Sequence, residues 1–323
     1  MVRGEGTDAG RDAVTALSWL RTNRDDLAGL PQPAGGSTIE RWKALAAIGQ
    51  QDLSLVRLAE GHVDALSILH ELDRRDLGRD GCWGVWAAEP SRLEAAPVDA
   101  GWRLVGEKRW CSGSDGLDHA LVTATAPDGP RLFAIDTDDA QAIPGSWEPI
   151  GMVATRSETM RFDAVVDRDA SLGGPNAYVD RPGFWAGAMG VAACWFGGAL
   201  GVADLLDDGC LGARQPHLSA VRGRVRSRLA GAAGCLTAAA HWLDAAARDT
   251  NEIRDRALAL RLVVEECARA VLDDVTIAGG SSSLAFAPAH ARRVVDLTVY
   301  VRQLDRHRTE AELGVQPSEA WPW

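Results

Sequence analysis

The sequence predicts an α+β fold with an N-terminal helical domain, a central β-barrel-like domain and a C-terminal four-helix bundle. Apolar residues recur at helical spacing up to about residue 80, give way to short alternating runs, and return to helical spacing after residue 173. At 323 residues the chain exceeds the size at which one hydrophobic core usually divides. We therefore expect three domains, at 1–80, 81–172 and 173–323.

The first domain is predicted to contain three helices. Apolar positions indicate a helix over 12–30, and the Pro- and Gly-rich run 31–36 ends it. Ser37 or Thr38 can cap the second helix, and a third is expected over 61–77. His62 and Asp64 lie two residues apart in the third helix. They point to different faces there, which favours a packing histidine over a catalytic pair.

Short alternating runs separated by turn residues predict the strands of the middle domain. We expect them near 83–88, 101–110, 119–125, 131–136, 145–152 and 159–166. Spacing of this kind is typical of a β-barrel or a sandwich. The loop after Trp110 comes where one strand ends, a position at which functional groups often lie.

The last domain opens with an uncharged stretch, 184–203, which is long enough to span a bilayer. Its many glycines and alanines instead favour a helix buried within a bundle, so we expect no membrane span. Further helices are expected at 217–248, 252–278 and 287–304. Four antiparallel helices would result.

Composition limits the possible partners. The formal net charge of −11 opposes binding to a phosphate backbone, so we expect no nucleic acid partner. The six cysteines show no metal-binding spacing and no secretory leader precedes them, which indicates reduced thiols, no metal site and a cytoplasmic location.

Two ordered motifs in the middle of the chain carry a family resemblance. The first consists of Ala87, Ala88, Glu89 and Pro90, then Gly101, Leu104, Gly106, Lys108, Trp110, Ser112, Gly113 and Asp118; the second is Gly151 to Ser157. Together with a later Gly279–Gly280 pair, they resemble the acyl-CoA dehydrogenase family of flavoproteins. The resemblance implies FAD as cofactor, a small-molecule acyl thioester as substrate, and a homodimer or a dimer of dimers formed through the bundle.

The resemblance also implies the cofactor-binding residues. It places Trp110 against the isoalloxazine ring and the Ser112 hydroxyl at the reactive edge of the flavin. Ala87 and Ala88 belong to the same site, with Ala88 where the family usually has a ring-contacting threonine. For the dinucleotide, Arg214 would contact phosphate. Gly279 and Gly280 would either allow its close approach or only break the chain between two helices.

The position of the family's usual catalytic glutamate is occupied here by Leu304, which cannot accept a proton. A minority of the family places this base at the start of the first C-terminal helix, which is Asp180 here. Asp180 is therefore the candidate base for α,β-dehydrogenation, or simply a carboxylate favoured near a helix start. Two further functions remain open: a flavin-dependent monooxygenase of the same fold, and a non-catalytic binding or assembly protein.

Overall fold

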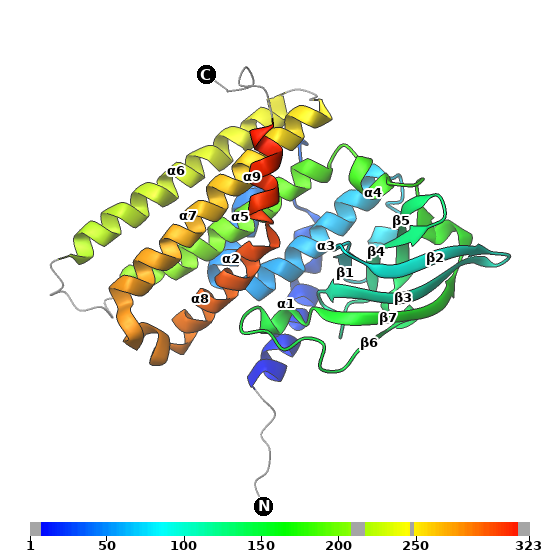
Figure 1. Ribbon diagram of the computed structural model, residues 1–323, viewed down its shortest axis with the longest axis horizontal. Helices are drawn as coiled ribbons and strands as arrows, with labels where there is room; N and C mark the ends of the chain where they lie inside the picture. Colours follow the sequence, from blue (N-terminus) through cyan, green and yellow to red (C-terminus); the bar gives the residue numbers. More distant parts are fainter. Residues whose placement is uncertain (1–7, 208–216, 246–248, 316–323) are drawn as a thin grey trace, which may run out of the picture. The chain divides into compact units, whose positions relative to one another are not determined.

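Figure 1 shows the computed structural model of the chain, which describes residues 8–207, 217–245 and 249–315. Contacts divide the chain into two compact units. The first, which we call the sheet unit, comprises Met1–Leu30 and Ser54–Phe184; the second, the helical unit, comprises Pro31–Leu53 and Trp185–Trp323. Each unit is described by itself.

The sheet unit combines one sheet with helices α1 and α3. Its elements are α1 (Asp8–Ala28), α3 (Leu53–Glu71), β1 (Trp83–Trp86), β2 (Arg92–Val98), β3 (Gly101–Cys111), β4 (His119–Ala126), β5 (Gly129–Asp136), β6 (Ala140–Ala142), β7 (Glu158–Val166), β8 (Ser171–Leu172) and α4 (Ala177–Asp180). The strands follow the order β6-β7-β3-β2-β4-β5-β8, and β1 pairs with β4 outside this path.

Close backbone approach explains one glycine of the sheet. A Cβ atom on Gly106 of β3 would come within 2.1 Å of the Arg92 carbonyl oxygen, and Gly106 has φ +126°. Only glycine therefore lets β2 pair with β3 at this register. This antiparallel pairing runs from Arg92 opposite Glu107 to Val98 opposite Gly101.

Two hydrophobic clusters bury the two faces of the sheet. One contains side chains from most strands: Trp86, Leu93, Ala95, Leu104, Cys111, Ala120, Val122, Ala124, Ala126, Phe133, Ile135, Met160, Phe162 and Val166. The other joins α3 to the sheet: Ala65, Ile68, Leu69, Trp83, Leu121, Leu132 and Leu172. The second cluster shows why α3 is amphipathic, since its apolar side covers strands that would otherwise face water.

The predicted α+β class with a central β-barrel was wrong. The strands form one mixed, eight-stranded sheet whose path ends at β6 and β8. The pairs β1–β4 and β2–β4 are parallel, which turn spacing alone does not reveal because it describes only neighbouring antiparallel strands. No strand covers 145–152, whereas β2 was missed. It is a weakly apolar strand that includes Pro97, and only Leu93 and Ala95 of it are buried.

The helical unit contains α2 (Thr38–Gln51), α5 (Phe184–Ala203), α6 (Leu218–Ala245), α7 (Thr250–Ala285), α8 (Pro288–Tyr300) and α9 (Arg306–Gly314). Helices α6 and α7 lie side by side (Figure 1). The expectation of a bundle of four helices was therefore too narrow, because α2 and α9 also belong to this unit.

Glycines on α5 allow close packing with α2. A Cβ on Gly197 would come within 2.2 Å of the Ala46 carbonyl oxygen, and one on Gly201 within 2.6 Å of the Gln50 carbonyl oxygen. The other end of α2 is held by α6: the Thr38 amide and hydroxyl donate to the Asp244 carboxylate at 2.8 and 2.6 Å. The predicted local cap of α2 is therefore supplied by a distant helix.

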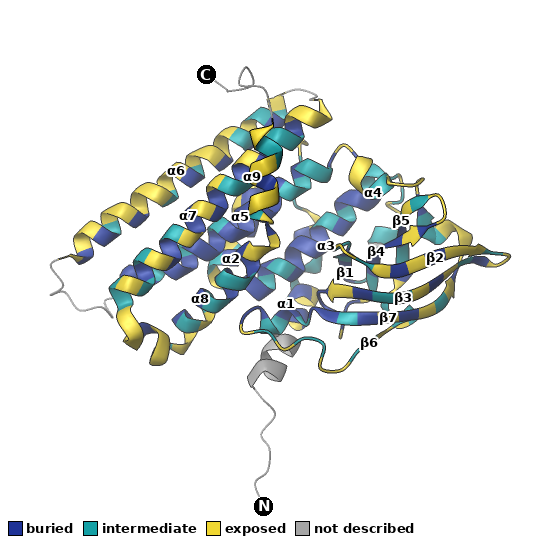
Figure 2. Cartoon of the chain, in the orientation of Figure 1, coloured by how far each residue is buried: buried dark blue, intermediate teal, exposed yellow. Residues whose placement is uncertain are grey.

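Within the described residues one helical segment, Phe184–Leu206, is long and apolar enough to cross a membrane. Its most apolar window is 78% buried inside the protein, and core helices pass the same test of length and composition. Figure 2 shows the contrast within the helical unit, where α6 is exposed along one face and α5 is largely buried.

Candidate active site

Strand β3 ends in a β-bulge that turns Trp110 out of the regular alternation. The pairing with β7 shifts between Lys108 and Cys111, so β3 carries one extra residue there. Trp110 has φ 64°, which is rare for a bulky residue, and its side chain is 52% exposed while Lys108 and Cys111 are buried. The bulge therefore presents an indole at the surface of the sheet unit.

A second tryptophan supports the exposed indole. The ring of Trp147 meets that of Trp110 edge to face, with centroids 5.4 Å apart and an interplanar angle of 77°. The Trp147 indole nitrogen donates to the Val153 carbonyl oxygen at 3.3 Å. The segment 145–152, which was expected to form a strand, thus contributes an aromatic support to the site.

Two loops are joined beside Trp110. The amide of Gly113 donates to the Thr155 carbonyl oxygen at 2.7 Å, and the Ser114 hydroxyl donates to the Arg156 carbonyl oxygen at 2.7 Å. Met152 and Arg156 have φ 59° and 45°, so three left-handed non-glycine residues, with Trp110, surround this junction. Backbone strain of this kind is often retained at functional sites.

Ser112 follows the bulge and is anchored through its backbone. Its carbonyl oxygen accepts from the Trp86 indole at 3.0 Å, which brings the end of β1 beside the loop. Its hydroxyl lies 2.8 Å from that of Ser157, which lies 2.8 Å from the hydroxyl of Thr155. Thr155 in turn donates to the Met152 carbonyl oxygen at 2.7 Å.

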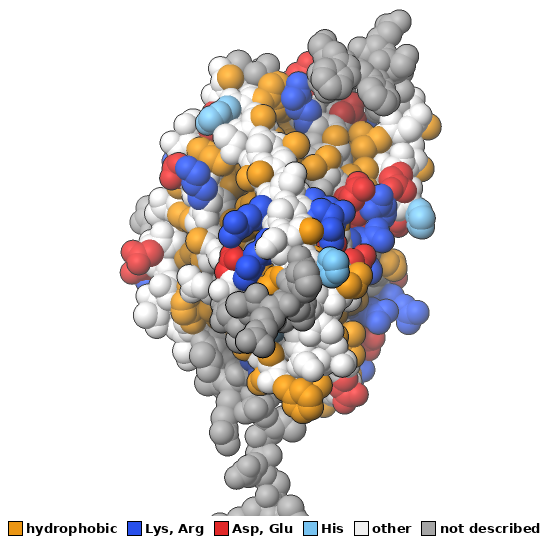
Figure 3. All heavy atoms as spheres, turned by 90° about the vertical axis from the view of Figure 1, so that its left-hand side faces the viewer, with side chains coloured by type: hydrophobic (Ala, Val, Ile, Leu, Met, Phe, Trp, Pro, Cys, Tyr) orange, Lys and Arg blue, Asp and Glu red, His pale blue; other side chains and the backbone are white. Residues whose placement is uncertain are grey.

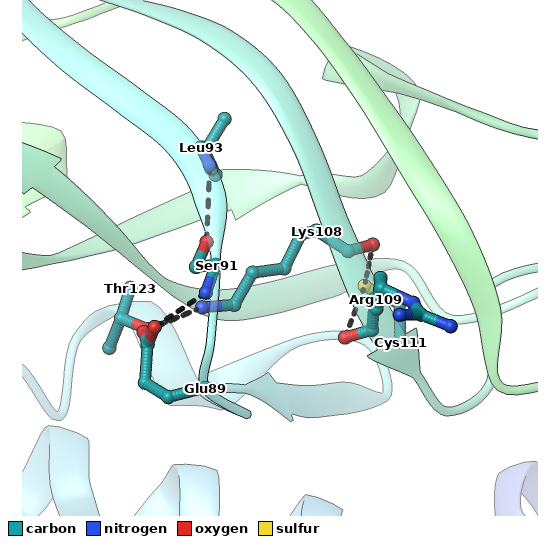
Figure 4. A network of polar contacts seen from close by, with 7 residues as sticks. All are labelled: Glu89, Ser91, Leu93, Lys108, Arg109, Cys111 and Thr123. Atoms are coloured by element: carbon teal, nitrogen blue, oxygen red, sulfur yellow. Dashed lines mark hydrogen bonds and ion pairs between the residues drawn. The ribbon is translucent and has the colours of Figure 1, made fainter.

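The buried side chain of Lys108 on strand β3 contacts Thr123 and Glu89 (Figure 4). The Lys108 ammonium donates to the Thr123 hydroxyl at 2.8 Å and to the Glu89 carboxylate at 3.3 Å. Burial lowers the pKa of Lys108, and the nearby Glu89 opposes this shift. Glu89 also accepts from the Ser91 amide at 2.6 Å. The Glu-Pro block and β3 are thereby fixed to each other.

The structure brings part of the predicted site together. Ala87 and Ala88 follow directly after Trp86, whose indole contacts Ser112, so both lie near the loop that also carries Trp110. Both alanines are half-buried. Sequence reasoning missed Ser157 and Thr155, although their block was part of the motif. Their signal was a pair of hydroxyl residues directly before a strand.

The remaining predicted cofactor contacts lie in the helical unit. Gly280 has φ 59° and ψ −169° and interrupts α7, so the predicted break after residue 278 is a kink within one helix. A Cβ on Gly280 would meet no atom within 4 Å, whereas one on Gly279 would come within 2.4 Å of the Ser283 hydroxyl. Their role toward a dinucleotide stays a prediction. Arg214 lies outside the described residues.

The candidate base does not lie in a polar network. Asp180 ends α4 with an exposed side chain, and within the described residues its carboxylate contacts no cation. Its neighbour Arg181 is buried and pairs instead with Glu71 at 3.1 Å and Asp64 at 3.7 Å. Leu304 is 8% exposed. Neither position 180 nor position 304 therefore provides a carboxylate that is fixed by neighbouring polar groups.

A separate pocket of about 440 Å³ lies in the sheet unit. His119 and Asp136 border it and pair at 2.7 Å, and burial raises the pKa of Asp139 nearby, with further contributions from Asp136 and Asp138. Its lining includes none of the residues around Trp110. Among the described residues, no group of three His, Cys, Asp or Glu side chains could hold a metal ion.

No family model matches the sequence. Over 97 residues the chain is 37% identical to dibenzothiophene monooxygenases of Rhodococcus erythropolis and Rhodococcus qingshengii, a match that covers 27% of this chain and 23% of each relative. The chain thus matches about a quarter of the length of these curated relatives.

Solved structures match over nearly the whole chain. The FMN-bound dibenzothiophene monooxygenase TdsC from Paenibacillus sp. A11-2 superposes with a TM-score of 0.74 at 18% identity, covering 95% of this chain and 96% of that one. XiaF from Streptomyces sp., in complex with FADH2 and glycerol, gives 0.71 at 16% identity, covering 96% and 98%. Methanesulfinate monooxygenase MsuC from Pseudomonas fluorescens gives 0.72 at 16% identity, covering 95% and 93%.

These findings correct the assignment to the acyl-CoA dehydrogenase family. The relatives found by sequence and by structure are monooxygenases, a different family with a similar fold. The motif around Lys108, Trp110 and Ser112 therefore does not by itself indicate dehydrogenation. An acyl thioester is not supported as substrate, because the neighbours are named for other small molecules.

Proposed function

We propose that this chain is a flavin-dependent monooxygenase that uses reduced flavin and dioxygen to add one oxygen atom to a small organic molecule. The observation that carries the proposal is the match over 95% of the chain to TdsC, a dibenzothiophene monooxygenase with an FMN-bound structure. The partial sequence match to other dibenzothiophene monooxygenases supports the same class.

The residues around Trp110 fit a flavin ring. A flat, largely apolar ligand needs a stacking face, which the half-exposed indole of Trp110 offers. It also needs polar groups at its edge, and the Ser112 hydroxyl, whose one side-chain contact within the described residues is with the Ser157 hydroxyl, can supply one. The backbone around both residues is fixed by the bulge and the joined loops, so the site is pre-organised.

A bound reduced flavin would supply the two electrons with which dioxygen yields one oxygen atom for the substrate and one molecule of water. In this scheme Trp110 binds and orients the ring, and Ser112 fixes its edge. The Lys108–Glu89 contact holds the Glu-Pro block against β3. No carboxylate has to remove an α-proton, which agrees with the buried Leu304 and the exposed Asp180.

The substrate we propose is a small aromatic heterocycle. Dibenzothiophene appears in the names of the sequence relatives, and one TdsC structure contains indole. The cofactor is FMN or FAD, since neighbours hold FMN or FADH2. This replaces the acyl thioester, and it leaves the FAD expectation as one of two flavins to be tested.

The test supplies the purified chain with a flavin reductase, NADH, either FMN or FAD, and dibenzothiophene or indole in air. We expect a product that gains one oxygen atom, with the label transferred from isotopically heavy dioxygen, as read by mass spectrometry. Catalase is added to remove free peroxide, and a reaction without the chain is the control. Absence of both flavin binding and product would overturn the proposal in favour of a non-catalytic protein of this fold.

A further inference from the structure

Three hydroxyl groups form a linear chain between the ends of β3 and β7. Ser112 contacts Ser157 at 2.8 Å, Ser157 contacts Thr155 at 2.8 Å, and Thr155 contacts the Met152 carbonyl oxygen at 2.7 Å. All three side chains are buried, with exposed fractions of 8%, 6% and 1% from Ser112 to Thr155. The chain therefore runs inward from the residue nearest to Trp110.

The carbonyl oxygen at the inner end fixes the direction of every bond. A carbonyl accepts but cannot donate, so the Thr155 hydroxyl must give its single proton to Met152. Thr155 can then only accept from Ser157, and Ser157 can only accept from Ser112. Each hydroxyl has one proton, and each proton is used.

The outer end of the hydroxyl chain, at Ser112, can therefore only accept a hydrogen bond from a ligand. The Ser112 hydroxyl has spent its proton on Ser157, so toward a ligand it offers lone pairs alone. A ligand atom that carries an N–H group meets an acceptor there. A ligand atom that has only a lone pair meets another lone pair, with no hydrogen bond and some repulsion.

We propose that Ser157 and Thr155 are positioning residues that lock Ser112 as an acceptor, so that the site prefers reduced over oxidised flavin. The proposal rests on the proposed function, because it assumes that a flavin edge lies against Ser112. The nitrogen at the reactive edge of the isoalloxazine carries a proton when the flavin is reduced and only a lone pair when it is oxidised. The hydroxyl chain thus distinguishes the two redox states.

The preference matters for the proposed monooxygenase because only reduced flavin can pass electrons to dioxygen. Oxidised flavin competes with reduced flavin for the same site, so selection for the reduced state keeps the site from being blocked. One hydrogen bond contributes about 1 kcal/mol net, which corresponds to roughly a fivefold difference in dissociation constant. We expect a difference of about five- to tenfold from Ser112.

The experiment measures the dissociation constants of reduced and oxidised FMN and FAD anaerobically, by quenching of tryptophan fluorescence. In the native chain we expect reduced flavin to bind more tightly. Ser157→Ala frees the Ser112 proton, and Thr155→Val frees the Ser157 hydroxyl to donate outward. Each variant should therefore lower the ratio of the dissociation constant of oxidised flavin to that of reduced flavin about five- to tenfold. Thr155→Ser retains the row of three hydroxyl groups and should keep the native ratio of the two dissociation constants.

Ser114→Ala is the matched control. This serine lies in the same loop, is buried, and donates to Arg156 outside the hydroxyl chain, so its loss should leave the ratio unchanged. The midpoint potential of the bound flavin gives a second reading. For a two-electron couple a tenfold loss of preference lowers the potential by about 30 mV.

The outcomes separate this inference from the proposed function. An unchanged ratio in Ser157→Ala and Thr155→Val, with flavin bound, would overturn the inference and leave the function intact. An equal fall in Ser114→Ala or Thr155→Ser would also overturn it, since general loosening of the loop would then be the cause. A native chain that binds flavin in neither state would instead contradict the proposed function, and this inference with it.

Discussion

At the scale of single residues, Trp110 combines an unfavourable backbone with an exposed side chain. A left-handed conformation costs a non-glycine residue of order 1 kcal/mol, and an indole that is 52% exposed recovers little of that by burial. The position is therefore not explained by folding stability alone. A bound planar ligand would give the indole the contact that the sheet unit does not.

Replacement of Trp110 should weaken flavin binding without unfolding the protein. We expect Trp110→Ala to raise the dissociation constant of reduced flavin about fivefold or more, because a stacking face worth on the order of 1 kcal/mol is removed. Val105→Ala is the matched control, an exposed apolar residue on the same strand. Titration and thermal unfolding are compared for both variants. Equal affinities in the two variants would show that Trp110 does not contact the flavin.

His62 predicts a pH dependence of folding. Its ring is 1% exposed and accepts from the Trp83 amide at 3.2 Å. Burial, with a contribution from the charge of Arg24, lowers the pKa of His62 from 6.5 to about 4. The folded state thus resists protonation. The stability that the neutral ring contributes is complete above pH 6.5 and is lost as the pH falls toward 4.

We therefore expect the unfolding free energy to fall by up to about 3 kcal/mol between pH 7 and pH 4 through this one residue. His62→Gln keeps an acceptor for Trp83 but does not titrate, so its stability should change less over the same range. Denaturant unfolding at a series of pH values checks the difference. Parallel curves for the two proteins would refute the assignment.

At the scale of elements, regular periodicity was predictable and long-range pairing was not. Helices α5 to α8 begin close to the expected positions, because apolar spacing is a local signal, although α7 continues past the predicted break to Ala285. Strand β1 pairs in parallel with β4, although the β2–β3 hairpin lies between them in the sequence, and no local sequence signal predicts such a pairing. The same holds for the site: Trp110 and Ser112 stand in a motif, but the bulge and the partners Ser157 and Thr155 depend on the register with β7.

Whether the fold requires the kink in α7 can be tested by replacing two glycines, Gly280 at the kink and Gly223 in the regular helix α6, with alanine. Gly280 has a conformation that only glycine adopts readily, so Gly280→Ala should destabilise the protein by about 1–3 kcal/mol although a methyl group has room there. Gly223 in α6 is helical and equally open, so Gly223→Ala should stabilise by about 0.5–1 kcal/mol. Thermal unfolding measures both. A stabilised Gly280→Ala would mean that the kink is not required by the fold.

At the scale of the whole molecule, the predicted homodimer stays a prediction, and exposed apolar residues of the helical unit support it. Val263 and Ile277 lie two heptads apart on α7 and are 42% and 79% exposed; Phe286 after that helix is 84% exposed. Figure 3, which views the side of the molecule that lies to the left in Figure 1, shows hydrophobic and basic side chains next to one another on that side. Apolar side chains repeated along one helix are typical of a surface that is covered by a partner.

We expect the native chain to have at least twice the mass of 34.4 kDa in solution, as a dimer or a dimer of dimers. Ile277→Asp places a charge in the proposed contact and should shift the protein toward the monomer, since an unpaired buried charge is costly. Val105→Asp, an exposed substitution in the sheet unit, is the control and should leave the mass unchanged. Light scattering over a range of concentrations gives the mass. A monomeric native chain would contradict the prediction, and a dimer that persists in Ile277→Asp would place the contact on another surface.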